Sequence, residues 1–263
     1  MVTISCGGKF FPNIQAVIFD KDGTLEDSQN FERELGIKRA RMIDAQIPGI
    51  GEPLLMAFGI EDNNIDPAGL MAVGSRWENE IAAAAYIAET GRSWFEAQKI
   101  AKKAFAEADK YLEKSVDNCP LFAGGLEVIK MLSEAGVKLG ILSADTTDGV
   151  KEFVGRHQLG EYFQLTMGGD RGISKPDPAL FLQACAALGV LPAETLMVGD
   201  SQGDLEMARG AGAAGVIGIC QGKAAKHLKE ADVACDRLDE IKIVHSDDLS
   251  GRTKLITAGS GGF

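Results

Sequence analysis

Two aspartates separated by one residue, Asp20 and Asp22, follow the short apolar run 16–19. Such a run is typical of a buried strand, and the Asp, Gly and Thr residues after it indicate a turn. A carboxylate at this place can attack phosphorus and store the phosphoryl group as an acyl phosphate. A second carboxylate can protonate the leaving oxygen and then activate water. Because Asp and Gly are also ordinary turn formers, the motif alone leaves a purely structural turn as an equal alternative.

A second pair of carboxylates, Asp200 and Asp204, follows the apolar run 195–198 and lies where a turn enters a predicted helix. Magnesium prefers oxygen ligands and keeps several waters, so one or two of these carboxylates together with Asp20 suffice to bind it. Helix capping by Asp200 or Asp204 is the structural alternative. Next to the first motif, a metal site is the better interpretation.

Two further residues have the chemistry that a phosphoryl group needs. Ser143 follows the apolar run 137–142, and Lys175 precedes a Pro-Asp-Pro segment. A hydroxyl donor and an ammonium group can neutralise the oxygens of a transferring phosphoryl group. Taken singly, each is weak evidence, since most serines after strands are caps and most lysines are solvated. In the Pro-Asp-Pro segment, Asp177 and Pro178 are expected to be the N-cap and first residue of a helix.

The elements that must position these residues form a strand and helix alternation. Further strands are predicted at 137–142, 162–167, 195–198 and 215–219, with helical patterns between most of them. Alternating strands and helices imply a parallel sheet, which binds ligands beyond the carboxyl ends of its strands. The candidate residues all follow or lie near such ends.

Between Asp27 and about Cys119 the strand signal vanishes and helical patterns replace it. Ser93 and Glu96 fit a capping box, and an apolar stripe at helical spacing indicates core packing. The stretch 49–74, rich in Gly and Pro, is expected to hold loops between shorter helices. The stripe consists of Ala97, Ala101, Ala104, Phe105, Ala108 and Leu112.

Composition restricts the class of protein. The 263 residues carry a net charge of −11, which disfavours nucleic acid as a partner. Five scattered cysteines without a CxxC pair argue against a zinc site and a disulfide framework and indicate reduced, packed thiols. With neither a membrane-length apolar run nor a signal peptide pattern, we expect a cytoplasmic protein that contacts no membrane. His157, His227 and His245 lie away from strand ends, so histidine chemistry is a poor rival.

Taken together, the motifs resemble those of the haloacid dehalogenase-like hydrolase superfamily. The segments 20–24 and 199–204, with Ser143 and Lys175 between them, occur in the order of that family's four motifs. The resemblance covers about 16–241 and is closest to the phosphatase branch with a helical cap after the first strand, the phosphoglycolate phosphatase and β-phosphoglucomutase type. It implies a Rossmann-like, doubly wound α/β core at 1–26 and 120–243 and a cap at 27–119. The residues 244–263 are expected to form a flexible C-terminal extension.

The resemblance also implies roles for the residues that touch substrate. Asp20 is expected to be the nucleophile and Asp22 the general acid/base. Ser143 and Lys175 are expected to hold the phosphoryl oxygens. Thr24, placed with the phosphate-binding residues, is expected to order the loop and help position Asp22.

The same resemblance implies a magnesium ion as cofactor. Asp20 and Asp200 would bind it directly, and Asp22 would contribute its backbone carbonyl. Asp204 would support the metal through water or by orienting Lys175. One departure concerns Asp145, which stands where the family often has asparagine and is expected either to alter a contact beside the phosphate or to cap the next helix.

The expected reaction is hydrolysis of a small phosphomonoester of a sugar or organic acid through an aspartyl-phosphate, by a monomer or homodimer. A phosphomutase and a noncatalytic protein on the same fold remain alternatives. Asp22 disfavours a dehalogenase, which needs no acid for an alkoxide leaving group. A phosphonatase would need a cap lysine, for which Lys38 is a weak candidate. The polar cap residues are expected to be solvated rather than to set specificity: Arg76, Glu78, Asn79 and Lys99.

Overall fold

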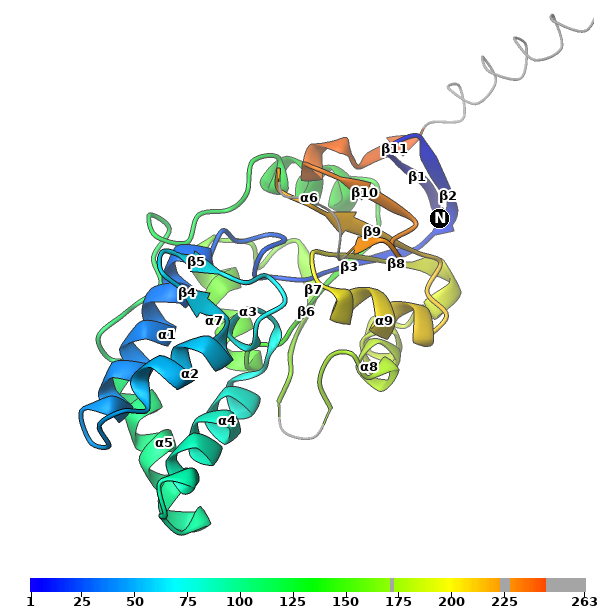
Figure 1. Ribbon diagram of the computed structural model, residues 1–263. Coiled ribbons are helices and arrows are strands. Elements are labelled where there is room, and N and C mark those ends of the chain that lie inside the picture. Colours follow the sequence, from blue (N-terminus) through cyan, green and yellow to red (C-terminus); the bar gives the residue numbers. More distant parts are fainter. Residues whose placement is uncertain (171–172, 223–227, 245–263) are drawn as a thin grey trace, which may run out of the picture.

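The computed structural model describes residues 1–170, 173–222 and 228–244. Its largest sheet has six parallel strands in the order β10-β9-β8-β3-β6-β7 (Figure 1). The parallel α/β fold predicted from the sequence is therefore confirmed. All the predicted strands are present, and β10 adds one that was not expected. The strands are β3 (Ala16–Phe19), β6 (Lys138–Ser143), β7 (Phe163–Gly168), β8 (Thr195–Gly199), β9 (Gly215–Ile219) and β10 (Val233–Cys235).

Strand β3 is the first of the six in chain order and lies between β6 and β8. Ala16 is aligned with Lys138 on one side and with Thr195 on the other. The strand order therefore reverses next to β3, which is where open parallel sheets bind ligands. The residues that follow β3, β6 and β8 meet at this one edge.

Helices cover both faces of the sheet (Figure 1). Val17 and Phe19 pack in one core cluster with α6 (Gly125–Glu134) and α7 (Thr147–Arg156). Ala16 and Ile18 pack in another cluster with α8 (Pro178–Leu188) and α9 (Gln202–Gly210). Because alternate residues of a strand point to opposite faces, a strand covered on both faces must be apolar throughout. This burial explains the continuous apolar run before Asp20.

A small antiparallel sheet at the N-terminus was not predicted. It consists of β1 (Val2–Cys6), β2 (Lys9–Ile14) and β11 (Lys242–Val244), in the order β11-β1-β2. Val244 thus belongs to a strand, although the extension was expected to begin there. The rest of the expected extension, 245–263, lies outside the described residues.

The region between β3 and α6 contains five helices with a hydrophobic cluster of their own. The alanine stripe of α5 is buried there as predicted, although Leu112 lies beyond the helix end. A short hairpin interrupts the helical pattern and was missed, since strands of two residues leave no periodicity. The elements are α1 (Gln29–Asp44), α2 (Gly51–Phe58), β4 (Ile60–Glu61), β5 (Asn64–Ile65), α3 (Leu70–Val73), α4 (Arg76–Glu89) and α5 (Trp94–Ala108).

Two chain segments connect this helical unit to the rest of the molecule, and they are hydrogen-bonded to each other. The Asp27 amide donates to the Pro120 carbonyl at 2.8 Å, and the Phe122 amide donates to the Leu25 carbonyl at 2.9 Å. The pairing holds the two connections side by side.

All five cysteines are buried free thiols, as predicted. In the part of the chain described, no helix combines the length and apolarity that crossing a membrane requires.

Candidate active site

The predicted site residues follow three neighbouring strands and meet at one edge of the sheet. Asp20 follows β3, Ser143 ends β6 and Asp200 follows β8. The Asp20 amide donates to the Val198 carbonyl at 2.8 Å, which continues the β3–β8 pairing into the loop. The nucleophile predicted from the sequence is thus held by backbone bonds of the sheet itself.

Lys175 contacts a carboxylate of the first motif and one of the last motif. Its Nζ lies 2.7 Å from Asp20 Oδ1 and 2.6 Å from Asp204 Oδ1. Burial disfavours the charged ammonium, but the two carboxylates outweigh this and raise the pKa of Lys175. The lysine is therefore a fixed cation beside Asp20. Asp204 orients it, which was one of the two roles expected for that residue.

Three carboxylates form a compact acidic cluster at the same place. Asp20, Asp200 and Asp204 each offer an oxygen, and these oxygens lie within 4.8 Å of one another. Burial raises the pKa of Asp20 well above its usual range, with Asp204 and Asp200 adding to the effect of burial and Lys175 opposing it. Burial and the nearby Asp204 raise the pKa of Asp200 to about 7.

These raised pKa values mean that the buried negative charge is only partly balanced by Lys175. A hard divalent cation with oxygen ligands would complete the balance, and Mg²⁺ fits this donor set. Asp20 and Asp200 are the residues that the sequence assigned to the metal, and both belong to the cluster. The side chain of Asp22, which was expected to contribute only its backbone carbonyl to the metal, does not belong to the cluster.

The loop after β3 can approach Asp200 only because residue 23 is glycine. Gly23 has φ +80°, and a Cβ atom there would lie 2.1 Å from Asp200 Oδ2. The next residue, Thr24, is fully buried, and its hydroxyl donates to Asp200 Oδ1 at 2.8 Å. Thr24 therefore orders the loop by binding a predicted metal ligand, and its hydroxyl contacts Asp200 rather than Asp22.

Ser143 is 1% exposed and opens the loop between β6 and α7. Its hydroxyl accepts a hydrogen bond from the Asp145 amide at 3.1 Å. The expectation that Asp145 caps the next helix is wrong, because Thr146 is the N-cap and accepts from the Gly149 amide. Asp145 instead binds Lys21, whose Nζ lies 3.0 Å from Asp145 Oδ2. The departure from asparagine thus comes with a buried cation that compensates its charge.

Two lysines contact Asp22, and neither was predicted from the sequence to belong to the site. Lys21 Nζ lies 2.7 Å from Asp22 Oδ2, and Lys114 Nζ lies 3.0 Å from Asp22 Oδ1. Burial would raise the pKa of Asp22, but Lys114 and Lys21 outweigh it and hold the pKa below its usual value. Lysines are solvated so often that no pattern in the sequence singled these out.

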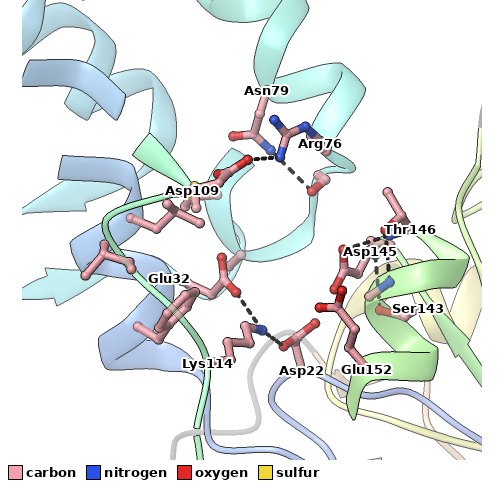
Figure 2. Close-up of a pocket in the computed structure, with 18 of the residues that line it drawn as sticks. Asp22, Glu32, Arg76, Asn79, Asp109, Lys114, Ser143, Asp145, Thr146 and Glu152 are labelled. Atoms are coloured by element: carbon pink, nitrogen blue, oxygen red, sulfur yellow. Dashed lines mark hydrogen bonds and ion pairs between the residues drawn. The ribbon is translucent and has the colours of Figure 1, made fainter. Parts of the chain in front are cut away.

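A cavity of about 680 Å³ lies between the site and the helical unit, as Figure 2 shows. Arg76 and Asn79 line it, and the Arg76 side chain is partly exposed. The expectation that these residues are solvated is wrong for Asn79, which is 2% exposed. It holds for Lys99, which is exposed, while Glu78 closes the capping box of Ser75. Arg39 was missed altogether. Figure 2 places Asp109 beside Arg76, and the Arg39 guanidinium also binds Asp109, at 3.1 Å.

Two earlier alternatives have little support in this geometry. Lys38 does not line the cavity; its Nζ lies over the Tyr111 ring, 4.1 Å from the centroid. That position does not suit a Schiff-base amine for a phosphonatase. His157 lies at the end of α7, where its Nε2 is 3.2 Å from Glu26 Oε1, and it does not line the cavity. His227 and His245 lie outside the described residues.

Known proteins resemble the chain over most of its length. Phosphoglycolate phosphatase from Pectobacterium atrosepticum is 29% identical over 236 residues, which are 87% of this chain and 91% of that protein. Phosphoglycolate phosphatase from Salmonella choleraesuis is 28% identical over 256 residues, 90% of this chain and 96% of the relative. The similarity therefore includes the helical region as well as the strands that carry the motifs.

The fold is shared with solved structures. A predicted phosphoglycolate phosphatase from Haemophilus somnus superposes with a TM-score of 0.63 at 24% identity, covering 87% of this chain and 96% of its own. The family model of the haloacid dehalogenase-like hydrolases matches residues 14–212, which span every motif described above. The chain belongs to the haloacid dehalogenase-like hydrolase family.

Proposed function

We propose that this hydrolase is a magnesium-dependent phosphatase that acts on small phosphomonoesters through an aspartyl-phosphate at Asp20. The observation that carries the proposal is the position of Asp20 at the end of β3. There it contacts the ammonium of Lys175 at 2.7 Å and lies in the acidic cluster with Asp200 and Asp204. A buried carboxylate beside a fixed cation suits attack on an anionic phosphoryl group, since the cation offsets the repulsion.

In the first step, an Asp20 oxygen forms a bond to phosphorus while the bond from phosphorus to the leaving oxygen breaks. Asp22, which lines the cavity, donates the proton that the leaving oxygen requires, so it must take up a proton before transfer, although Lys114 and Lys21 lower its pKa and favour its ionised form in the structure. Ser143 and Lys175 bind the phosphoryl oxygens during transfer. The products of the step are an acyl phosphate on Asp20 and a free alcohol.

In the second step, water attacks the phosphorus and Asp22 accepts its proton. The bond between phosphorus and Asp20 breaks, which releases phosphate and restores the carboxylate. Bound Mg²⁺, held by Asp20, Asp200 and the Asp22 carbonyl with Asp204 in support, would offset the negative charge of the nucleophile and the phosphoryl group.

We further propose that residues 1–26 and 120–243 act as the catalytic core and residues 27–119 as a cap that closes over the substrate. The cavity of about 680 Å³ lies between the two and falls in the range of small-molecule sites. A cap of this kind would exclude water during transfer. It also leaves little room for a macromolecule, so we propose a small cytoplasmic ester of a sugar or organic acid as substrate, with phosphoglycolate as one candidate from the relatives.

The test is phosphate release from a panel of small esters that includes phosphoglycolate, hexose phosphates and 4-nitrophenyl phosphate. We expect release with Mg²⁺, none with chelator and none from the Asp20→Asn protein. The matched control is Asp27→Asn, a neighbouring aspartate outside the cluster. Release by Asp20→Asn at the wild-type rate would exclude Asp20 as the nucleophile.

A phosphomutase is the second candidate, because β-phosphoglucomutase from Clostridium difficile has the same fold with a TM-score of 0.57, 15% identity and coverage of 93% of this chain and 99% of its own. The two activities differ in the acceptor of the phosphoryl group. Conversion of a hexose 1-phosphate to the 6-phosphate without phosphate release would favour the mutase. If the phosphoryl group were transferred neither to water nor to a sugar, a noncatalytic protein would be favoured.

A further inference from the structure

Lys114 is placed where the two connections to the helical unit, the general acid/base and the first cap helix come together. Its Nζ lies 3.0 Å from Asp22 Oδ1, 3.3 Å from Glu26 Oε2 and 3.0 Å from Glu32 Oε1. Figure 2 shows the ammonium between Glu32 and Asp22 at the cavity wall. Its side chain is 16% exposed, so this is a buried ion cluster rather than a surface pair.

Both oxygens of Asp22 are covered by ammonium groups. Lys114 lies at Oδ1, and Lys21 lies 2.7 Å from Oδ2. An ammonium group only donates hydrogen bonds, so each lysine holds an oxygen that the acid/base must turn toward the substrate. The two lysines therefore compete with a leaving oxygen for Asp22, and withdrawal of either one would leave an oxygen of Asp22 free to turn toward the substrate.

Lys21 is the less able to withdraw. It is fully buried, immediately follows the nucleophile and also binds Asp145, 3.0 Å away, in the loop after β6. These partners belong to neighbouring strand ends of one sheet. Lys21 therefore stays with Asp22 whatever the helical unit does.

Lys114 belongs to the connection that follows α5, and its partner Glu32 belongs to α1. The hydrogen-bonded pairing of Leu25 and Asp27 with Phe122 and Pro120 lies between this part of the connection and the sheet. A rotation of the helical unit about that pairing would carry Lys114 together with Glu32 and change its distance from Asp22.

Glu26 does not need Lys114 for its own charge balance. Its Oε1 binds Arg156 Nη2 at 2.5 Å and lies 3.2 Å from His157 Nε2, and Lys21 lies 3.9 Å from Oε2. Asp22 and Glu32 have fewer cations beside them. The carboxylates that depend most on Lys114 for charge balance are thus Asp22, the acid/base, and Glu32, which lies on the cap.

We propose that Lys114 is a positioning residue that couples movement of the cap to the general acid/base, holding Asp22 while the cap is open and freeing its Oδ1 when Glu32 draws the lysine away. This inference rests on the proposed function, because it assumes the acid/base role of Asp22. Without Lys114, Asp22 would keep only its contact with Lys21, and its Oδ1 would lose the ammonium that now lies between it and Glu32.

The test uses two esters that differ in their need for an acid. An alkyl ester, the best of the panel, needs its leaving oxygen protonated, whereas 4-nitrophenolate leaves without a proton because it is a weak base. We expect Lys114→Met to lower kcat/KM for the alkyl ester about 10- to 100-fold, a part of what general acid catalysis contributes. For 4-nitrophenyl phosphate we expect a change of no more than about threefold, which also verifies that the variant is folded.

Asp22→Asn is the benchmark and should give the same contrast between the two esters, with a larger loss on the alkyl ester. Lys110→Met is the matched control, an exposed lysine four residues earlier that should change neither rate. Equal losses on both esters for Lys114→Met, or no loss on either, would overturn the coupling. A wild type that releases phosphate from neither ester would instead remove the proposed function, and the role of Lys114 with it.

Discussion

Charge balance among a few buried residues determines what the site can hold. Asp20, Asp200 and Asp204 form the cluster, and the ammonium of Lys175 lies within hydrogen-bonding distance of Asp20 and Asp204. In such a cluster the carboxylates favour their neutral forms until another cation arrives. Binding of Mg²⁺ and ionisation of Asp200 should therefore be coupled, and the coupling can be measured as stability.

The pH dependence of stability without metal follows from Asp200. Its pKa is raised from 3.8 to about 7 in the folded protein, so between these values the folded chain keeps a proton that the unfolded chain has released. The resulting stability is fully present below the unfolded pKa and is lost as the pH rises through about 7. In chelator we expect the melting temperature to fall from about pH 5 to about pH 7.5, and to fall less for Asp200→Asn.

Thermal unfolding with and without Mg²⁺ checks this expectation. Saturating Mg²⁺ should raise the wild-type melting temperature most at the upper end of that pH range, since binding to the folded state alone stabilises it. Asp148→Asn, which changes an exposed aspartate on α7, is the control and should behave like wild type. Identical pH profiles for wild type and Asp200→Asn would contradict the assignment.

The sequence predicted the residues that follow strands but not those that approach from elsewhere. Asp20, Ser143 and Asp200 each lie at the end of a strand, so their residue type and position together identified them as candidate site residues. Lys21 lies within the first motif, but nothing in the sequence indicates that a lysine there is buried. Lys114 has no such position, and its burial depends on the path of the connection after α5. Contacts between segments 92 residues apart, such as that of Lys114 with Asp22, leave no periodicity in the chain.

Among the elements, the loop after β3 is the one whose backbone must take a special shape. Gly23 combines φ +80° with a close approach to Asp200, and both would oppose a side chain. Gly8 has a similar φ of +84° but no atom within 4 Å of where a Cβ would stand. A comparison of substitutions at Gly23 and Gly8 therefore distinguishes the effect of backbone strain from the steric displacement of Asp200, a proposed metal ligand.

We expect Gly23→Ala to lower phosphatase activity by at least about 100-fold, since a shift of about 1 Å in a site can cost that much. Gly8→Ala should cost about 1 kcal/mol of stability and leave activity within about twofold. Phosphate release and thermal unfolding of both variants provide the check. Full activity in a folded Gly23→Ala protein would show that the approach to Asp200 is not needed.

The elements differ in how clearly the sequence predicts them. Strands β3, β6, β8 and β9 are buried on both faces, so continuous apolar runs identified them. The hairpin β1–β2 was missed, although Gly7 and Gly8 between two alternating segments are a recognisable two-residue turn. Strands β10 and β11 have three residues each, too few to show a period.

At the scale of the whole molecule, the sheet with its covering helices, the helical unit and the cavity between them determine what can enter. The helical unit has its own core, exemplified by the contact of Phe58 with Phe105, whose ring centroids lie 6.3 Å apart. The unit is joined to the sheet by only two hydrogen-bonded connections. This arrangement would let the unit move as one body, as the proposed cap requires, and would limit the size of the substrate.

We expect efficient release of phosphate from small esters and release from folded phosphoproteins that is at least about 100-fold slower, because a cavity of about 680 Å³ accommodates only small ligands. A phosphorylated protein and a small ester assayed at equal phosphate concentration make the comparison. Equal rates for the two would contradict closure of the cap over the substrate.

The most direct test of the account is to find the phosphoryl group on Asp20. Protein mixed with its best ester and Mg²⁺ is quenched with acid within the first turnover, digested, and examined by mass spectrometry. We predict that the peptide carrying Asp20 gains the mass of one phosphoryl group, and that the Asp20→Asn protein shows no such gain. Turnover of the ester with the phosphoryl group on another residue, or on none, would contradict the account.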